Sequence, residues 1–107
     1  MFRFPYPYLS GEVDLPEERE RHIADRHPDL LPEHRLRITE TLADPDLVRR
    51  STRGNARLLS RWYTDLRGGK HVVVVVTSDP GGQGRHWIVT AYLARRLAEG
   101  ALEWKRD

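Results

Sequence analysis

The chain has 107 residues, of which 38% are hydrophobic and 32% are charged, with a formal net charge of +2 at pH 7. This length predicts one domain with a single modest core and no room for a large cofactor domain. The longest apolar run is the valines at 72–76, far short of the roughly 20 apolar residues of a membrane helix, so we expect a soluble protein without a membrane partner. The absence of cysteine and of a signal-peptide-like apolar core favours the cytoplasm.

Charge is unevenly distributed along the chain. Residues 1–48 hold 11 acidic and 6 basic residues, a net charge of −5, whereas residues 49–107 hold 12 basic and 5 acidic residues, a net charge of +7. Of the 18 basic residues, only Lys70 and Lys105 are lysines. The excess of arginine over lysine fits either GC-rich codon usage or phosphate binding. A basic second half makes nucleic acid, or another polyanion, the expected partner class.

The first half of the sequence predicts helices. Residues 1–11 contain two prolines and are expected to form an extended or irregular lead-in. Asp14 predicts the cap of a helix that runs to about residue 27 and stops at Pro28. A second helix is predicted over 32–43, followed by a short third turn of helix at 44–48.

The second half predicts strands, which begin after a loop at 51–55. β-branched and aromatic residues separated by glycine-containing turns predict three strands, at 58–66, 71–77 and 86–92. A short closing helix is predicted at 93–99. The expected fold is therefore α+β, with two to three N-terminal helices packed on a three- to four-stranded antiparallel sheet and a short C-terminal helix, in one domain spanning 1–107.

Several motifs occur in an order found in a known group of nucleases. They are His22-Ile23-x-x-Arg26-His27-Pro28, Thr41-Leu42-x-Asp44-Pro45-Asp46-x-Val48, the valine strand and Val89-Thr90-Ala91-Tyr92. Over residues 12–104 the chain resembles the phage-associated nucleases grouped with barnase, EndoU, colicin-type and RelE-type ribonucleases. This resemblance implies helices on a four-stranded antiparallel sheet and metal-independent RNA cleavage. It also implies catalytic residues at His22 and His27 and a hydroxyl–aromatic pair at Thr90 and Tyr92.

Metal-free RNA cleavage needs a base for the 2′-OH proton, an acid for the leaving oxygen, and donors for the charged phosphorane. Histidine suits both proton roles at neutral pH. His22 and His27, ranked in that order, lie roughly 140° apart on an ideal helix, so both can serve one site only if His27 leaves the helix at Pro28. The same spacing argues against a two-histidine metal site. The structural alternative is that one of these two histidines is exposed and the other packs under the sheet edge.

Alternation along 86–92 separates two sets of side chains. Trp87, Val89, Ala91 and Leu93 are expected on the helix-covered face, and His86, Ile88, Thr90 and Tyr92 on the open face. Thr90 and Tyr92 would then lie about 6.6 Å apart, close enough to address one phosphate and its sugar. The alternative is a solvated sheet face on which Thr and Tyr serve only as good strand formers.

Basic and aromatic residues supply the expected substrate contacts. Arg57, Arg61 and Tyr63 share one parity of the first predicted strand, where arginine could hold phosphate and Tyr63 could stack a base. The substrate-binding candidates are Arg53, Arg57, Arg61, Tyr63, Lys70 and His86. Each is equally compatible with an ordinary surface role. No cofactor and no metal site are expected, because the acids are dispersed and the glycine-rich loop at 81–84 lacks the ending of a phosphate-binding P-loop.

The sequence therefore predicts a cytoplasmic, metal-independent endoribonuclease-like domain that produces 2′,3′-cyclic phosphate ends. Such a domain could serve as a toxin or phage-derived effector restrained by an antitoxin or immunity protein. The alternative is a catalytically inactive RNA- or protein-binding domain of the same fold. An active enzyme requires His22 or His27 within reach of Thr90 and Tyr92.

Overall fold

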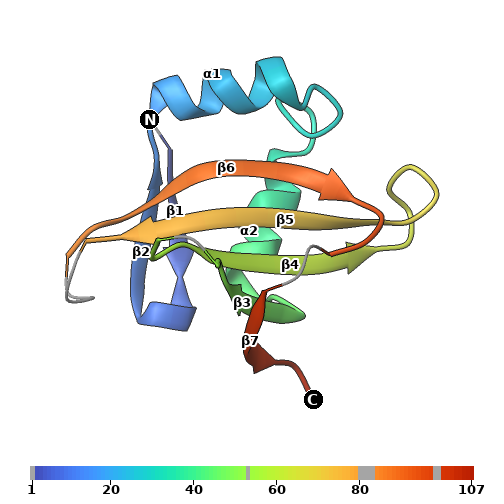
Figure 1. Cartoon of the computed structure of the whole chain (residues 1–107). Coiled ribbons are helices and arrows are strands. Elements are labelled where there is room, and N and C mark those ends of the chain that lie inside the picture. The colour runs from blue at the N-terminus through green and yellow to red at the C-terminus, as the bar shows by residue number, and fades with distance from the viewer. Residues whose placement is uncertain (1, 53, 80–83, 98–99) are drawn as a thin grey trace.

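β-branched residues favour strands, and they are concentrated in the second half of the chain, above all in the valines at 72–76. The computed structural model describes residues 2–52, 54–79, 84–97 and 100–107. These residues form a seven-stranded sheet in the order β1-β2-β6-β5-β4-β3-β7, together with two α-helices and one short 3-10 helix (Figure 1). The pairing of β2 with β6 is parallel and all other pairings are antiparallel. The prediction of a three- to four-stranded antiparallel sheet with a C-terminal helix is therefore wrong.

The expected irregular lead-in is a β-hairpin. β1 (Phe2–Tyr6) pairs with β2 (Gly11–Leu15) across the 3-10 helix η1 (Pro7–Leu9). The prediction that Asp14 caps the first helix is wrong, because Asp14 lies in β2 and its carboxylate forms ion pairs with Arg3 and Arg85. The guanidinium of Arg3 holds the pKa of Asp14 below its usual value, against the opposing effect of burial.

The two helices lie close to their predicted positions. α1 (Glu17–Arg26) ends just before His27, as Pro28 predicts, and α2 (Arg35–Ala43) ends where expected. α2 covers one face of the sheet, hereafter the α2 face, and lies behind the sheet in Figure 1. The opposite face, turned toward the viewer, is called the front face. α1 runs along the edge of β6 beyond the two residues, His86 and Trp87, that pair with β2.

The predicted strands of the second half are present and slightly displaced. β4 (Arg57–Tyr63), β5 (Lys70–Ser78) and β6 (His86–Ala94) form an antiparallel meander. The predicted turn between β4 and β5 is confirmed, and Gly69 there has φ +103°. An added Cβ at Gly69 would lie 2.6 Å from the Trp62 ring, so the turn also requires a residue without a side chain. Residues 80–83 of the second predicted turn lie outside the described residues.

Two predicted helical segments are strands. Residues 44–48 do not form a helical turn: β3 (Leu47–Arg50) pairs with β4. The predicted helix over 93–99 is also wrong, because β6 continues through Ala94 and β7 (Ala101–Lys105) pairs with the outer edge of β3. β3 forms a hairpin with β4, the next strand in the chain, whereas β7 pairs with β3, about 50 residues away, which local patterns do not show.

The hydrophobic core lies between the α2 face and the helices. Its largest fully buried side chains include Tyr6, Leu15, Ile23, Ile38 and Leu42. The β5 valines alternate: Val72, Val74 and Val76 belong to this core, whereas Val73 and Val75 lie on the front face.

Candidate functional site

A β-bulge in β6 decides which side chains reach the front face. Val75 of β5 lies opposite Thr90 whereas Val76 lies opposite Ile88, so Val89 is the extra residue. The side-chain alternation therefore inverts at Val89, and Trp87, predicted to face the helices, joins Thr90 and Tyr92 on the front face.

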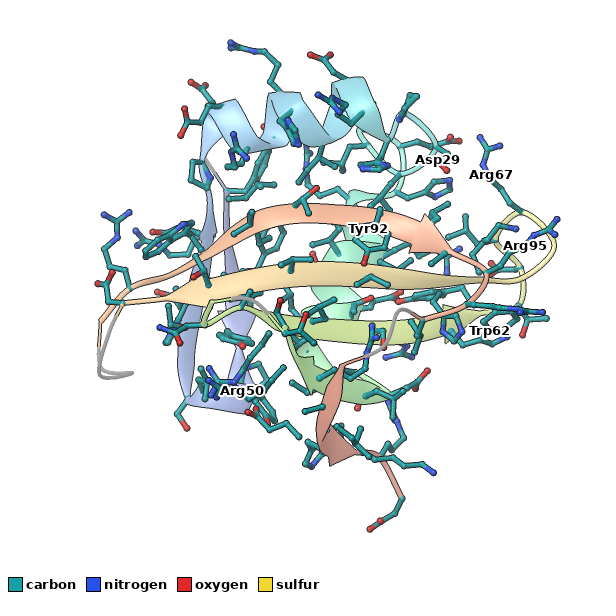
Figure 2. All side chains as sticks on the ribbon, in the orientation of Figure 1. Asp29, Arg50, Trp62, Arg67, Tyr92 and Arg95 are labelled. Atoms are coloured by element: carbon teal, nitrogen blue, oxygen red, sulfur yellow. The ribbon has the colours of Figure 1, made fainter. Side chains whose placement is uncertain are left out.

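The bulge places three side chains in one row along the front face. Trp87, Thr90 and Tyr92 lie opposite Thr77, Val75 and Val73. Successive members are therefore separated by two β5 residues, about 6.6 Å. All three are half-buried, and Tyr92 is labelled on β6 in Figure 2. Thr90 and Tyr92 share the front face as predicted, but His86 and Ile88 do not, because they precede the bulge and lie on the opposite face.

α1 adds two functional groups beside this row. Arg19, Ile23 and His27 follow one another at intervals of four residues, and Ile23 is fully buried. Arg19 Nη1 donates a hydrogen bond to the Val89 carbonyl oxygen at 3.5 Å, and the His27 ring centroid lies 5.9 Å from that of Tyr92. Eight helical residues rise about 12 Å, which matches the roughly 10 Å from Val89 to Tyr92 along β6. We call Arg19, His27, Thr90 and Tyr92 the α1–β6 seam.

His27 reaches the seam because it has left the helix. Its backbone has φ −133° and ψ 64°, outside the helical range, and the next residue is Pro28. The two rings are tilted by 39°, an arrangement between parallel stacking and an edge-to-face contact. Within the described part of the chain, His22 makes no hydrogen bond, ion pair or ring contact. The structure thus brings His27, and not His22, to Tyr92.

Arg19 is free to bind an anion. Of the ion pairs formed among the described residues, none includes Arg19. Its half-buried side chain lies at the start of the seam, where a guanidinium could hold phosphate with two parallel hydrogen bonds. The sequence interpretation missed Arg19, although its spacing from Ile23 and His27 was visible. Trp87 was missed because nothing in the sequence marks the bulge.

The predicted phosphate-binding arginines lie elsewhere. Arg57 and Arg61 share one parity of β4, as expected, but they lie opposite core valines and therefore on the α2 face. Arg57 Nε donates to Glu103 at 2.8 Å, and Arg61 Nη1 donates to the Asp44 carbonyl oxygen at 3.1 Å. The structure does not bring either arginine to Thr90 and Tyr92.

Tyr63 and Lys70 are also engaged elsewhere. Tyr63 is 7% exposed, so its ring offers no surface on which a base could stack. Burial, reinforced by donation to Glu40 at 2.8 Å, raises the pKa of Tyr63 to about 12. Lys70 Nζ donates to the Arg67 carbonyl oxygen at 2.9 Å and thereby closes its own turn.

His86 is part of the interior, and Arg53 lies outside the described residues. His86 is 7% exposed, and its Nδ1 lies 2.6 Å from Ser78 Oγ. Its ring makes an edge contact with Tyr6 at 5.3 Å. These contacts connect β1, β5 and β6 on the α2 face.

The seam combines groups suited to phosphate chemistry. It offers a cation, an imidazole, a phenol and a hydroxyl along about 10 Å of β6, beside an indole. Residues 84–97 and the other described ranges contain no cluster of three or more His, Cys, Asp or Glu placed to hold a metal ion. Neither described helix has the length and apolar composition needed to cross a membrane. Comparison with protein-family models, curated proteins and solved structures found no match to this chain.

Proposed function

We propose that the chain is a metal-independent endoribonuclease that cleaves RNA at the α1–β6 seam. The observation that carries the proposal is the contact between the His27 and Tyr92 rings, 5.9 Å between centroids, beside an arginine without an ion-pair partner among the described residues. A base, a hydroxyl donor and a phosphate-binding cation are what cleavage by the neighbouring 2′-OH requires.

The proposed reaction assigns one role to each group. His27 accepts the 2′-OH proton while O2′ bonds to phosphorus and the bond from phosphorus to O5′ breaks. The Tyr92 hydroxyl gives its proton to O5′, and the imidazolium of His27 returns a proton to the phenolate. Arg19 and Thr90 donate hydrogen bonds to the phosphorane oxygens. The products are a 2′,3′-cyclic phosphate and a free 5′-hydroxyl.

We place this activity in the cytoplasm, since a chain without cysteine suits a reducing compartment. A toxin or phage-derived effector would use such chemistry, and an antitoxin or immunity protein that covers the front face would block it. The second candidate is an RNA-binding domain without activity. The observation that favours it is that the partner of His27 is a phenol and not a second imidazole.

The test is incubation of the purified protein with a mixed RNA pool in the presence and absence of EDTA. We expect EDTA-resistant cleavage with 2′,3′-cyclic phosphate ends, and its loss in His27→Ala purified in parallel. Cleavage that EDTA abolishes and Mg²⁺ or Mn²⁺ restores would contradict the mechanism. Salt-dependent binding without cleavage would instead support the binding domain.

A further inference from the structure

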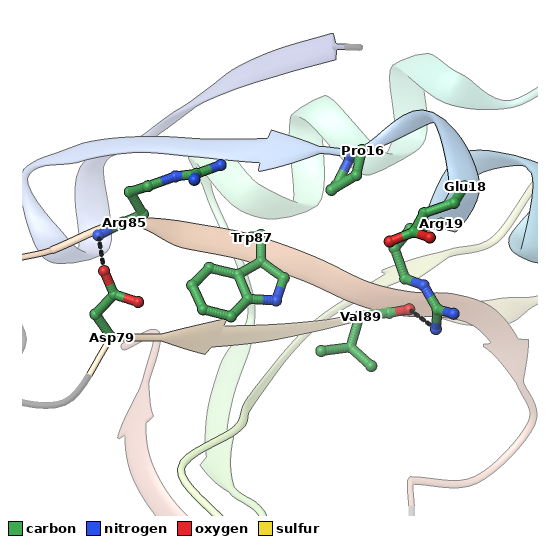
Figure 3. A pocket seen from close by; sticks show the side chains of 7 residues that line it. All are labelled: Pro16, Glu18, Arg19, Asp79, Arg85, Trp87 and Val89. Atoms are coloured by element: carbon green, nitrogen blue, oxygen red, sulfur yellow. Dashed lines mark hydrogen bonds between the residues drawn. The ribbon is translucent and has the colours of Figure 1, made fainter.

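A hollow of about 450 Å³ adjoins the seam at the Trp87 end. It lies where β6 and the start of α1 meet, next to Asp79 and Arg85, and Figure 3 shows the Trp87 ring between Arg85 and Arg19. Pro16 and Val89 add apolar atoms to its wall, and Glu18 lines it beside Arg19. This volume is within the range of small-molecule sites and accommodates one nucleobase with its sugar.

The hollow is held in place by contacts on both sides. The Arg85 N–H donates to Asp79 Oδ2 at 3.0 Å, and the Arg85 guanidinium lies 3.3 Å from Asp14. Arg19 closes the other side through its hydrogen bond to the Val89 carbonyl oxygen. The indole therefore lies in a hollow whose two flanking arginines, Arg85 and Arg19, each contact another part of the chain.

The chemistry of the hollow suits a base with its phosphate. An indole face offers stacking to any base, and arginine can contribute through its charge and its planar guanidinium. Arg85 is already paired with Asp14, whereas Arg19 has no carboxylate partner among the described residues. A phosphate is therefore better placed at Arg19, on the side of the hollow that continues into the seam.

We propose that this hollow binds one unpaired nucleobase of the RNA, stacked on Trp87, with the adjoining phosphate at Arg19; this inference rests on the proposed function. Trp87 and Thr90 are separated by only two β5 residues, about 6.6 Å, so the stacked base adjoins the scissile phosphate. A base in a duplex cannot present its face to an indole. The substrate is therefore single-stranded RNA or an unpaired loop.

The test measures binding and cleavage separately. Binding of a fluorescein-labelled single-stranded RNA is measured by anisotropy in the His27→Ala background, with and without Trp87→Leu. Stacking of one base predicts binding weakened about 5- to 150-fold by Trp87→Leu. Trp104→Leu is the control, because Trp104 is 39% exposed but lies opposite Val48 on β7, an edge strand that β5, β4 and β3 separate from β6. It should change binding by less than about twofold.

A second measurement does not depend on the folding of Trp87→Leu. The chain has three tryptophans, so the double variant Trp62→Phe/Trp104→Phe retains Trp87 as its only indole. We expect single-stranded RNA to quench its fluorescence and an equimolar duplex of the same sequence to leave it unchanged.

The inference is overturned if Trp87→Leu is folded and binds RNA like its parent, if Trp104→Leu weakens binding as much, or if duplex RNA quenches equally. Absence of RNA binding by the parent also overturns it. Trp87-dependent binding without cleavage by the unsubstituted chain would support the hollow and refute only the catalytic proposal. If folded Trp87→Leu binds RNA like its parent and cleavage persists, the inference about the hollow is refuted and the catalytic proposal is not.

Discussion

Replacing His27 with alanine and Tyr92 with phenylalanine, singly and together, tests the ring pair at the seam. Tyr92→Phe retains the ring contact with His27, and the Tyr92 hydroxyl makes no hydrogen bond within the described ranges, so the free energy of unfolding should change by less than about 0.5 kcal/mol. His27→Ala removes the contact between the two rings and should cost about 0.5–1.5 kcal/mol. Both variants should therefore remain folded.

The expected losses of activity are much larger than these effects on stability. Removing a positioned base lowers the rate about 10²- to 10⁴-fold, and removing one transition-state hydroxyl lowers it about 10²- to 10³-fold. Because His27 and Tyr92 exchange one proton in the proposed reaction, the double variant should lose less than the product of the two single losses. His22→Ala should lose less than about threefold, since among the described residues His22 makes no hydrogen bond, ion pair or ring contact with the seam residues.

Single-turnover cleavage of an end-labelled RNA by each variant gives these ratios, and urea unfolding verifies that each is folded. Equal losses in His22→Ala and His27→Ala would refute the assignment of the base. Strict additivity of His27→Ala and Tyr92→Phe would refute the shared proton. Full activity in folded Tyr92→Phe would exclude the phenol as the acid.

Three further predictions concern the fold. Glu103→Gln should lower the free energy of unfolding by about 1–3 kcal/mol at pH 7, because Glu103 accepts hydrogen bonds from Tyr8, Arg50 and Arg57. Asp25→Asn is its control in urea titrations, because Asp25 accepts no side-chain hydrogen bond among the described residues. Burial raises the pKa of Tyr63 to about 12, so this tyrosine ionises at a lower pH in the unfolded chain than in the folded one. The free energy of unfolding should therefore fall between about pH 10 and 12, and it should fall less steeply in Tyr63→Phe. Val74→Ala should cost about 2 kcal/mol in the same titrations, whereas Leu36→Ala, which is 67% exposed in the parent, should cost less than about 0.5 kcal/mol.

Each of these predictions has a contrary outcome. Unchanged stability in Glu103→Gln would show that the polar contacts of β7 contribute nothing. If the free energy of unfolding falls equally at alkaline pH in the parent and in Tyr63→Phe, ionisation of Tyr63 is not the cause. Equal effects of the Val74 and Leu36 substitutions would contradict the placement of Val74 in the core.

Strands and helices with local signals could be predicted from the sequence. The valines of β5 predict a strand because β-branched residues favour strands, and the proline after His27 predicts the end of α1 because proline ends helices. β3 and β7 could not be predicted in this way, since both are short and their pairing with each other joins segments about 50 residues apart in the chain. The order of the sheet and its parallel β2–β6 pairing follow from the same distant contacts.

The site shows a similar limit. Alternation placed Thr90 and Tyr92 on one face, and Pro28 allowed His27 to leave the helix. Alternation could not show which face of the sheet α2 would cover. The shared parity of Arg57 and Arg61 could therefore be predicted, but not that both lie on the α2 face. The bulge at Val89 also has no sequence signal, because its extra residue is an ordinary strand former.

The central claim is that RNA is cleaved at the seam by its own 2′-OH. The most direct measurement compares the unsubstituted chain and His27→Ala on one single-stranded sequence, made as RNA and as 2′-O-methyl RNA, with EDTA present. We expect the unsubstituted chain to cleave only the RNA and His27→Ala to cleave it at least about 100-fold more slowly. Cleavage of the 2′-O-methyl strand, or full activity of folded His27→Ala, would contradict the account.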